Sequence, residues 1–177
     1  CTGKMELYGQ TFHCWKEKGH GWMSLKNAMK QSCDTYFYEV ARLLGVDRLS
    51  LTAKKFGLGK KVLGNYFDVE KNGLFPNTEW KKNNLGKGWV LGETLITGIG
   101  QGYIQSTPLQ LCMMTAQIAN GGYAIKPKII VDSNPISYED AKQSMENQLL
   151  FNSDSKLLEE TKLFKNKNNI KIVQEAM

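Results

Sequence analysis

The sequence lacks any long hydrophobic run. No apolar stretch approaches the roughly 20 residues that a membrane-spanning helix needs, and no signal peptide opens the chain. The chain starts with Cys1 instead of methionine and ends on Ala176-Met177, inside a segment with the pattern of a helix. We therefore expect both ends to be cuts through a longer protein, whose remaining parts can carry a leader or a membrane anchor.

Charge of one sign is not gathered into a stripe either. The chain carries 23 lysines and arginines against 17 aspartates and glutamates, a formal net charge of +6, but the lysines are scattered and mixed with acids. A concentrated basic stripe is the pattern of a nucleic-acid surface. We therefore predict a generally solvated basic surface and no nucleic-acid partner, with attraction to an anionic envelope polymer as the second interpretation.

The length of 177 residues and the hydrophobic content of 41% suffice to bury one core, and no internal repeat is visible. Hydrophobic spacing and turn residues predict the local elements. We expect a hairpin over residues 1–14, helices over 24–32, 35–44, 46–56 and 107–120, an irregular loop over 57–88, short strands at 123–125 and 128–131, a short helix over 155–164 and the start of a helix at 170–177.

The helix over 107–120 has the clearest start signal in the chain. Thr107 is predicted as its N-cap, with Pro108 in the first turn and Gln110 completing a capping box. Spacing predicts that its buried stripe contains Leu111, Met114 and Ile118. Cys112 lies next to this stripe, and we expect it to be a small core residue and not a nucleophile.

Two helical patterns meet at residues 32–34. Apolar residues recur at helical spacing on both sides of this point, and Gly45 follows the second pattern as a C-cap. Ser32 and Asp34 flank the corner, with Asp34 where a helix N-cap belongs, and Cys33 between them should point to the opposite side. Taken alone, the two polar residues fit an ordinary pair of helix caps.

The residues around this corner are more specific than a pair of caps. Trp15 and the run Gly19-His20-Gly21 precede it, and the aromatic run Tyr36-Phe37-Tyr38 follows it. This setting resembles the transpeptidase domain of class B penicillin-binding proteins, most closely the penicillin-binding protein 2 group, whose members carry a Ser-x-Asn or Ser-x-Asp motif before an aromatic-rich helix. Further matches to the family are Ser32-Cys33-Asp34, Gly100-Gln101-Gly102 and Thr107-Pro108-Leu109-Gln110.

The resemblance implies an α/β (α+β) fold of the penicillin-binding protein and β-lactamase type, of which this chain forms mainly the helical lobe. It implies one partial transpeptidase domain over residues 1–177. Within it we expect a hairpin and metal loop at 1–22, helices with the second motif at 23–56, a cleft-side loop with a helix and short strands at 57–131, and an insertion with the start of a helix at 132–177.

The resemblance also implies a function. Such proteins are serine D-Ala-D-Ala transpeptidases that cross-link peptidoglycan stem peptides through an acyl-enzyme during cell-wall elongation, and they bind β-lactam antibiotics. The implied location is the periplasmic face of the bacterial inner membrane, with membrane proteins of the elongation machinery as partners. By position, Ser32 would relay a proton near the nucleophile's lysine, and Asp34 would hold that lysine or bind the substrate amide.

Of the three motifs of this chemistry, the K-T-G motif is absent from the chain and the nucleophile motif does not occur at the expected position. The nucleophile pattern S-x-x-K occurs once, at Ser153-Asp-Ser-Lys156, which follows the second motif instead of preceding it, and we interpret it as chance. The chain contains no K-T-G. By the family's order the nucleophile lies before Cys1 and the K-T-G strand after Met177, so we expect this chain alone to be inactive.

Spacing rather than family points to a metal. Cys1, Cys14, His20 and Cys33 form a C-x₁₂-C-x₅-H-x₁₂-C pattern. Three thiolates and an imidazole make a closed structural zinc set, and the hairpin would bring Cys1 beside Cys14. The rival interpretation is a Cys1–Cys14 disulfide in an oxidising compartment. His13 is the weaker ligand candidate, because strand alternation should turn it away.

Two other functions stay open at this point. The first is a zinc-stabilised interaction module that keeps the helical lobe but has no catalytic role. The second makes Cys1 an N-terminal nucleophile, against which stands the lack of an obvious partner base within its reach.

Overall fold

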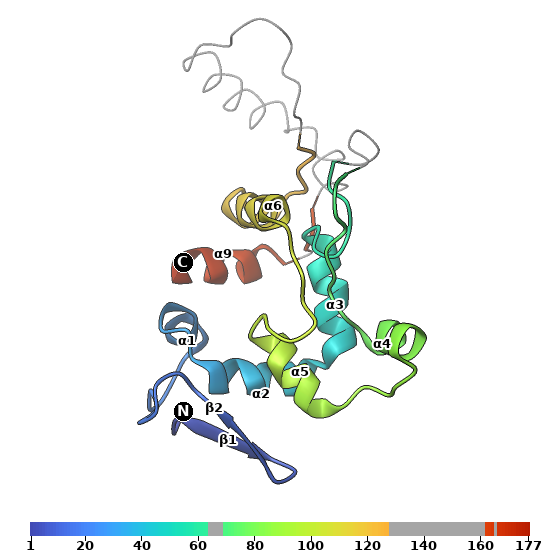
Figure 1. Cartoon of the computed structure of the whole chain (residues 1–177). Helices are drawn as coiled ribbons and strands as arrows, with labels where there is room; N and C mark the ends of the chain where they lie inside the picture. Colours follow the sequence, from blue (N-terminus) through green and yellow to red (C-terminus); the bar gives the residue numbers. More distant parts are fainter. Residues whose placement is uncertain (64–68, 128–161, 165) are drawn as a thin grey trace, which may run out of the picture.

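The computed structural model describes residues 1–63, 69–127, 162–164 and 166–177. It places the hairpin at one end of the molecule beside α2, with the C-terminal helix α9 next to α1 and α6 (Figure 1). This helix-rich arrangement with one small sheet agrees with the helical lobe expected from the sequence. The elements are, in chain order, β1 (Lys4–Leu7), β2 (Gln10–His13), α1 (Leu25–Lys30), α2 (Asp34–Leu44), α3 (Val46–Lys55), α4 (Thr78–Leu85), α5 (Leu91–Gly98), α6 (Pro108–Ala119) and α9 (Lys167–Ala176).

The predicted hairpin is confirmed. β1 and β2 pair antiparallel, with Lys4 opposite His13 and Leu7 opposite Gln10. Two residues close the turn, Tyr8 and Gly9, and both have positive φ, 48° and 77°. Positive φ at both central residues is what a type I′ turn requires, and its twist matches that of the flanking strands. Gln10 is therefore the first residue of the second strand.

The core lies where α5 crosses α2. Leu95 on α5 and Ala41 on α2 are 0% and 1% exposed. Gly98 allows the close approach, because a Cβ atom at this position would lie 2.4 Å from the Ala41 Cβ. This crossing joins the first part of the chain to the segment that follows α4, and Figure 1 shows α5 lying against α2.

The expected irregular loop over 57–88 contains a helix, so this prediction was wrong in part. α4 begins after Asn77, whose side chain accepts a hydrogen bond from the Trp80 backbone, and it ends at Gly86 in the left-handed region. Asn before a helix and Gly after it are recognisable boundary signals, and Glu79 in the first turn suits the helix dipole. The weak hydrophobic periodicity of this short helix hid it.

The buried face of α6 also differs from the prediction. Thr107, Pro108 and Gln110 form the expected N-terminal cap, but the buried residues are Gln110, Met113 and Gln117. The Gln110 amide donates to the carbonyl oxygens of residues 60 and 72, and the Gln117 amide donates to that of residue 56. Buried amides are stable here because loop carbonyls satisfy them.

Residues of α6 that were predicted as core lie nearer the surface. Leu111 is 45% exposed, and Met114 and Ile118 are only partly buried. Cys112 is exposed and is not the core residue that was expected. The helix therefore turns its glutamine face, and not its aliphatic face, toward the loop beneath it.

α9 confirms the helix expected near the chain end, and it begins earlier, at Lys167. Gln174 on α9 donates to the carbonyl oxygens of Ile118 and Ala119, which joins α9 to the end of α6. The strand predicted over 128–131, most of the helix predicted over 155–164 and the Ser153–Lys156 pattern lie outside the described residues. Among the helices that the structure describes, none combines the length and the apolar character needed to cross a bilayer.

Candidate functional site

The corner between α1 and α2 places Ser32 on the surface in an unusual backbone conformation. Ser32 is exposed and has φ of 48°, in the left-handed region that non-glycine residues rarely adopt. Its backbone N–H donates to the Met29 carbonyl oxygen at 3.2 Å, which closes the last turn of α1. Among the described residues its hydroxyl has no hydrogen-bond partner. The serine therefore presents a free hydroxyl at a fixed bend.

Asp34 lies beside it, but it is not the N-cap that the sequence suggested. Cys33 is the N-cap residue of α2, and Asp34 is the first helical residue. The Asp34 carboxylate accepts a hydrogen bond from the Trp15 backbone N–H at 2.8 Å. The long-range bond replaces local capping, while the negative charge still suits the helix N-terminus. Ser32 and Asp34 thus frame the corner, and Cys33 between them is fully buried, as predicted.

Tyr38 anchors α2 to the hairpin one turn below this corner. Its hydroxyl donates to the His13 carbonyl oxygen at 3.1 Å. Burial raises the pKa of Tyr38, and the nearby groups Asp34 and Cys14 add to this effect. The strand β2 and the helix that carries the motif are therefore joined by a neutral hydroxyl.

The structure brings together all four residues of the proposed metal set. The ligand atoms of Cys1, Cys14, His20 and Cys33 all lie within 4.8 Å of one another. His20 Nδ1 is 3.5 Å from the Cys1 sulfur and 3.5 Å from the Cys14 sulfur. With Zn–S and Zn–N bonds of about 2.3 and 2.05 Å, the edge of a tetrahedral zinc site is about 3.6 Å. The donor set, and the two distances from His20 Nδ1 to the sulfurs, therefore suit a tetrahedral zinc site.

The other side of the histidine ring is not satisfied by the described residues. His20 Nε2 is buried and has no hydrogen-bond partner among them. A histidine that binds a metal usually donates its second N–H to a carboxylate or carbonyl oxygen. Here the ring is held by an edge-on contact with Trp15 instead, with ring centroids 5.2 Å apart. His13 lies outside the cluster, on the exposed side of β2.

The structure also bears on the two alternatives for these cysteines, a Cys1–Cys14 disulfide and Cys1 as a nucleophile. All four cysteines of the chain lie in the described part, and each is a free thiol there, including Cys1 and Cys14. One argument against Cys1 as a nucleophile was wrong, because His20 Nδ1, a possible base, lies 3.5 Å from its sulfur. That imidazole is equally close to Cys14 and faces Cys33 as well, so the arrangement has the form of a ligand set and not of a nucleophile–base pair.

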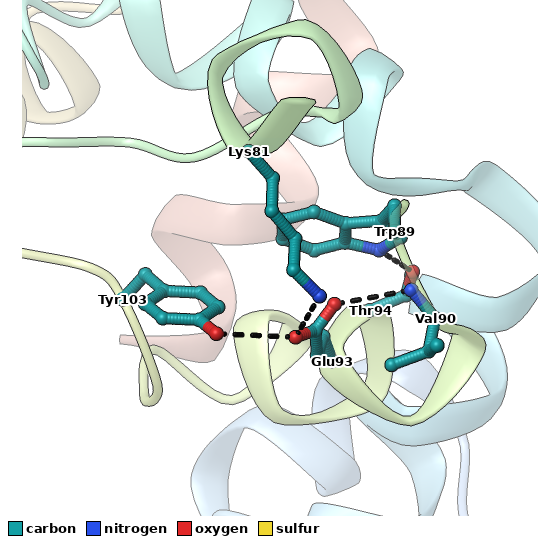
Figure 2. A network of polar contacts seen from close by, with 6 residues as sticks. All are labelled: Lys81, Trp89, Val90, Glu93, Thr94 and Tyr103. Atoms are coloured by element: carbon teal, nitrogen blue, oxygen red, sulfur yellow. Dashed lines mark hydrogen bonds and ion pairs between the residues drawn. The ribbon is translucent and has the colours of Figure 1, made fainter. Parts of the chain in front are cut away.

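A second polar centre was not predicted from the sequence. It lies between α4 and α5 and is built by six residues, shown in Figure 2: Lys81, Trp89, Val90, Glu93, Thr94 and Tyr103. The Lys81 ammonium, on a residue only 5% exposed, is 2.5 Å from the Glu93 carboxylate. The Tyr103 hydroxyl donates to the same carboxylate oxygen at 3.2 Å, and the Val90 N–H donates to the other at 3.0 Å.

The ion pair governs the protonation of the partly buried Glu93 carboxyl group. Burial alone raises the pKa of Glu93, but hydrogen bonds from Lys81 and the Val90 backbone, together with the Lys81 charge, outweigh it and lower that pKa. Lys81 also lies over the ring of Trp89, at 5.8 Å from its centroid. A lysine on the predicted loop and a glutamate on the next helix give no sequence signal of their pairing, because neither spacing nor periodicity connects them.

Comparison with known proteins shows the family to which this chain belongs. The family model described as penicillin binding protein transpeptidase domain matches residues 2–170. Peptidoglycan D,D-transpeptidase MrdA of Acinetobacter baumannii is 42% identical over 119 residues, which are 67% of this chain and 18% of that protein. The chain therefore spans about a fifth of the length of the curated relatives it matches.

Solved structures show the same fold. The Pseudomonas aeruginosa PBP2 in complex with WCK 5153 is 44% identical, with a TM-score of 0.68 over 75% of this chain and 31% of that one. The complex between PBP2 and MreC from Helicobacter pylori is 26% identical, with a TM-score of 0.76 over 99% of this chain and 29% of that one. The second match extends over both polar centres and over the C-terminal helix.

Proposed function

The chain belongs to the penicillin-binding protein transpeptidase domain family. We propose that the full-length protein that contains it is a peptidoglycan D,D-transpeptidase of the penicillin-binding protein 2 type. The observation that carries this proposal is the family match over residues 2–170, which extends from the hairpin through α6 and into the start of α9. The Ser-x-Asp corner supplies the chemical reason, because it presents a serine hydroxyl and a carboxylate from one bend.

In the proposed reaction, a serine of the full-length protein attacks the carbonyl of the penultimate D-alanine of a stem peptide. The bond to the terminal D-alanine breaks, and the amine of that residue leaves with the proton taken from the serine. An amine of a neighbouring stem then attacks the acyl-enzyme, which forms the cross-link and frees the serine. Penicillin acylates the same serine by opening its β-lactam ring, so adduct formation measures the first step.

In this scheme Ser32 relays the proton, and Asp34 binds a neighbouring lysine or the substrate amide. The free Ser32 hydroxyl suits a relay, because it can accept and donate a proton within one hydrogen-bond network. The Asp34 carboxylate keeps one oxygen for ligands other than the Trp15 N–H, so it can hold a lysine or a substrate amide. The nucleophile and the K-T-G strand belong, in our proposal, to parts of the protein outside this chain.

Fluorescent penicillin tests the activity. We expect a covalent adduct with the full-length protein and none with the 177-residue chain alone. In the full-length protein, Ser32→Ala should lower the acylation rate by about 10²-fold, as for a lost proton-relay group. Labelling of the isolated chain would bring Ser153 back as a nucleophile. No adduct with the folded full-length protein would instead favour the non-catalytic interaction module.

We also propose a structural zinc ion bound by Cys1, Cys14, His20 and Cys33. The support is the meeting of three thiols and an imidazole within 4.8 Å at a largely buried corner. The ion would tie the hairpin to the start of α2 and take no part in the chemistry. Elemental analysis of protein purified without added metal should find about one zinc per chain. No zinc, with two thiols missing under denaturing conditions, would favour the Cys1–Cys14 disulfide.

The proposed activity also implies the ligands, the location and the partners of the full-length protein. Peptidoglycan stem peptides are its substrate and β-lactam antibiotics its inhibitors, at the periplasmic face of the inner membrane. A partner of the MreC kind is supported by the Helicobacter pylori complex, which is similar to this chain over 99% of its length. Fractionation and co-purification of the tagged full-length protein test both points. Recovery in the cytosol without a membrane partner would contradict them.

A further inference from the structure

The side chain of Trp15 lies against the corner without being buried there. It is 63% exposed, so packing does not explain its position. Its indole Nε1 donates to the carbonyl oxygen of Gln31 at 3.0 Å and to that of Ser32 at 2.8 Å. Its backbone N–H donates to the Asp34 carboxylate at 2.8 Å. One residue thus contacts both polar members of the motif, Ser32 and Asp34, from 17 and 19 positions away in the sequence.

The carbonyl groups that it binds do not need this indole for solvation. They lie at the exposed end of α1, where water can satisfy the last carbonyl oxygens of a helix. What water cannot supply is a fixed position. Ser32 holds a left-handed φ of 48°, a conformation that costs a non-glycine residue free energy and persists only when its surroundings impose it. The bifurcated indole bond provides that constraint.

The other side of Trp15 is fixed as well. Its ring makes a T-shaped contact with the His20 ring at an interplanar angle of 70°, and Cys14 precedes Trp15 in the chain. The indole is therefore placed by the cysteine–histidine cluster and passes that placement to the serine. A ring held on one side and bonded to the motif on the other is suited to aim the Ser32 hydroxyl.

We propose that Trp15 is a positioning residue, which sets the orientation of Ser32 and Asp34 for acyl transfer without touching substrate. The inference rests on the proposed function, because it acts through the proton-relay role of Ser32. Removing the indole N–H should leave substrate binding intact and slow the chemical step, since only the direction of the relay hydroxyl changes.

The test is stopped-flow acylation of the full-length protein by a fluorescent penicillin, with the Kd of the initial complex and the acylation rate constant fitted separately. Trp15→Phe should lower the rate constant about tenfold and change the Kd less than about twofold. Trp22→Phe is the matched control, because Trp22 is fully exposed and should acylate at the wild-type rate. A wild-type rate in Trp15→Phe overturns the inference.

A double variant separates positioning from general loosening. If Trp15 acts through Ser32, then Trp15→Phe combined with Ser32→Ala should be no slower than Ser32→Ala alone. A further tenfold loss in the double variant would show that the two act independently and would overturn the inference alone. An unchanged rate in Ser32→Ala would overturn the proposed role of the serine, and the inference with it.

A second substitution covers the case in which Trp15→Phe does not fold. Benzothienylalanine at position 15 has the shape of tryptophan but a sulfur atom in place of the indole N–H. It should reproduce the tenfold loss in rate at a melting temperature near that of the wild type. A wild-type acylation rate in this variant contradicts the inference irrespective of the phenylalanine result.

Discussion

Two partly buried polar centres among the described residues differ in how their groups are satisfied. Between α4 and α5, the Glu93 carboxylate receives an ammonium, a hydroxyl and a backbone N–H, so its oxygens are paired within the protein. At the corner of α1 and α2, three thiols face one imidazole, and the buried Nε2 of His20 has no partner among the described residues. The first centre is complete as it stands, whereas the second has the composition of a ligand set.

The difference separates two ways of joining distant segments. In an internal ion pair, both charges belong to side chains of the protein. The contribution of the pair to stability is limited by the desolvation of the two groups. A cluster of thiols gains little from its own contacts and most from an ion that binds the thiolates. We therefore expect the corner that carries Ser32 to depend on metal supply, and the α4–α5 centre to depend on pH.

Removal of the proposed zinc ion is expected to have the largest effect. Chelation, or Cys33→Ser, should lower the free energy of unfolding by several kcal/mol, which is less than the roughly 10–16 kcal/mol that zinc contributes to small zinc-finger peptides. The melting temperature with and without chelator measures this. Cys112→Ser is the matched control, because this cysteine is exposed and outside the cluster, and it should melt like the wild type with one zinc bound. Equal melting temperatures for Cys33→Ser and Cys112→Ser would contradict a structural metal at this corner.

The next largest effect is expected from Lys81→Met. The substitution leaves the Glu93 carboxylate largely buried beside apolar atoms without its counter-charge, which should cost about 3 kcal/mol. Urea unfolding measures it, with Lys82→Met on the exposed side of the same helix as control. Adding Glu93→Gln to Lys81→Met should recover part of the loss, because the uncompensated charge is gone. A double variant less stable than Lys81→Met would contradict this account.

The pH dependence of the α4–α5 centre should be smaller but specific. The folded-state pKa of Glu93 lies below its reference value of 4.5, so the unfolded state binds more protons between the two values. The contribution to stability is therefore complete above pH 4.5 and is lost as the pH falls through the folded-state pKa. Melting temperatures from about pH 6 to about pH 3 should fall less steeply in Glu93→Gln than in the wild type. Parallel curves would show that this carboxyl is not a source of acid lability.

The smallest effect is expected for an ion pair of similar length whose side chains are much more exposed to water. Arg42 and Glu39 on α2 lie 2.6 Å apart, close to the 2.5 Å of Lys81 and Glu93, yet their side chains are 38% and 47% exposed. Water screens such a pair, so Arg42→Ala should leave the melting temperature within experimental error. A loss as large as that of Lys81→Met would show that distance, and not burial, sets the strength of these pairs.

Local sequence patterns predicted one of the buried polar arrangements and missed another. The spacing of four ligands correctly anticipated the cysteine–histidine cluster, because a short hairpin and a short loop leave few paths for the chain. The buried face of α6 was missed, because periodicity counts apolar residues and cannot foresee that loop carbonyls will satisfy Gln110 and Gln117. The assignment of Ser32 and Asp34 to catalysis, and of the four ligands to zinc, stays a prediction.

The sequence by itself determined the local elements of this protein: the Tyr8-Gly9 turn, the capped start of α6 and the corner after α1. These depend on contacts within a few residues, so residue type and spacing suffice. Only the tertiary structure decided that Lys81 meets Glu93 and that the Trp15 indole reaches Ser32. Such contacts form between segments whose relative placement depends on the packing of α5 on α2 and of the hairpin on the corner, and no local signal encodes that placement.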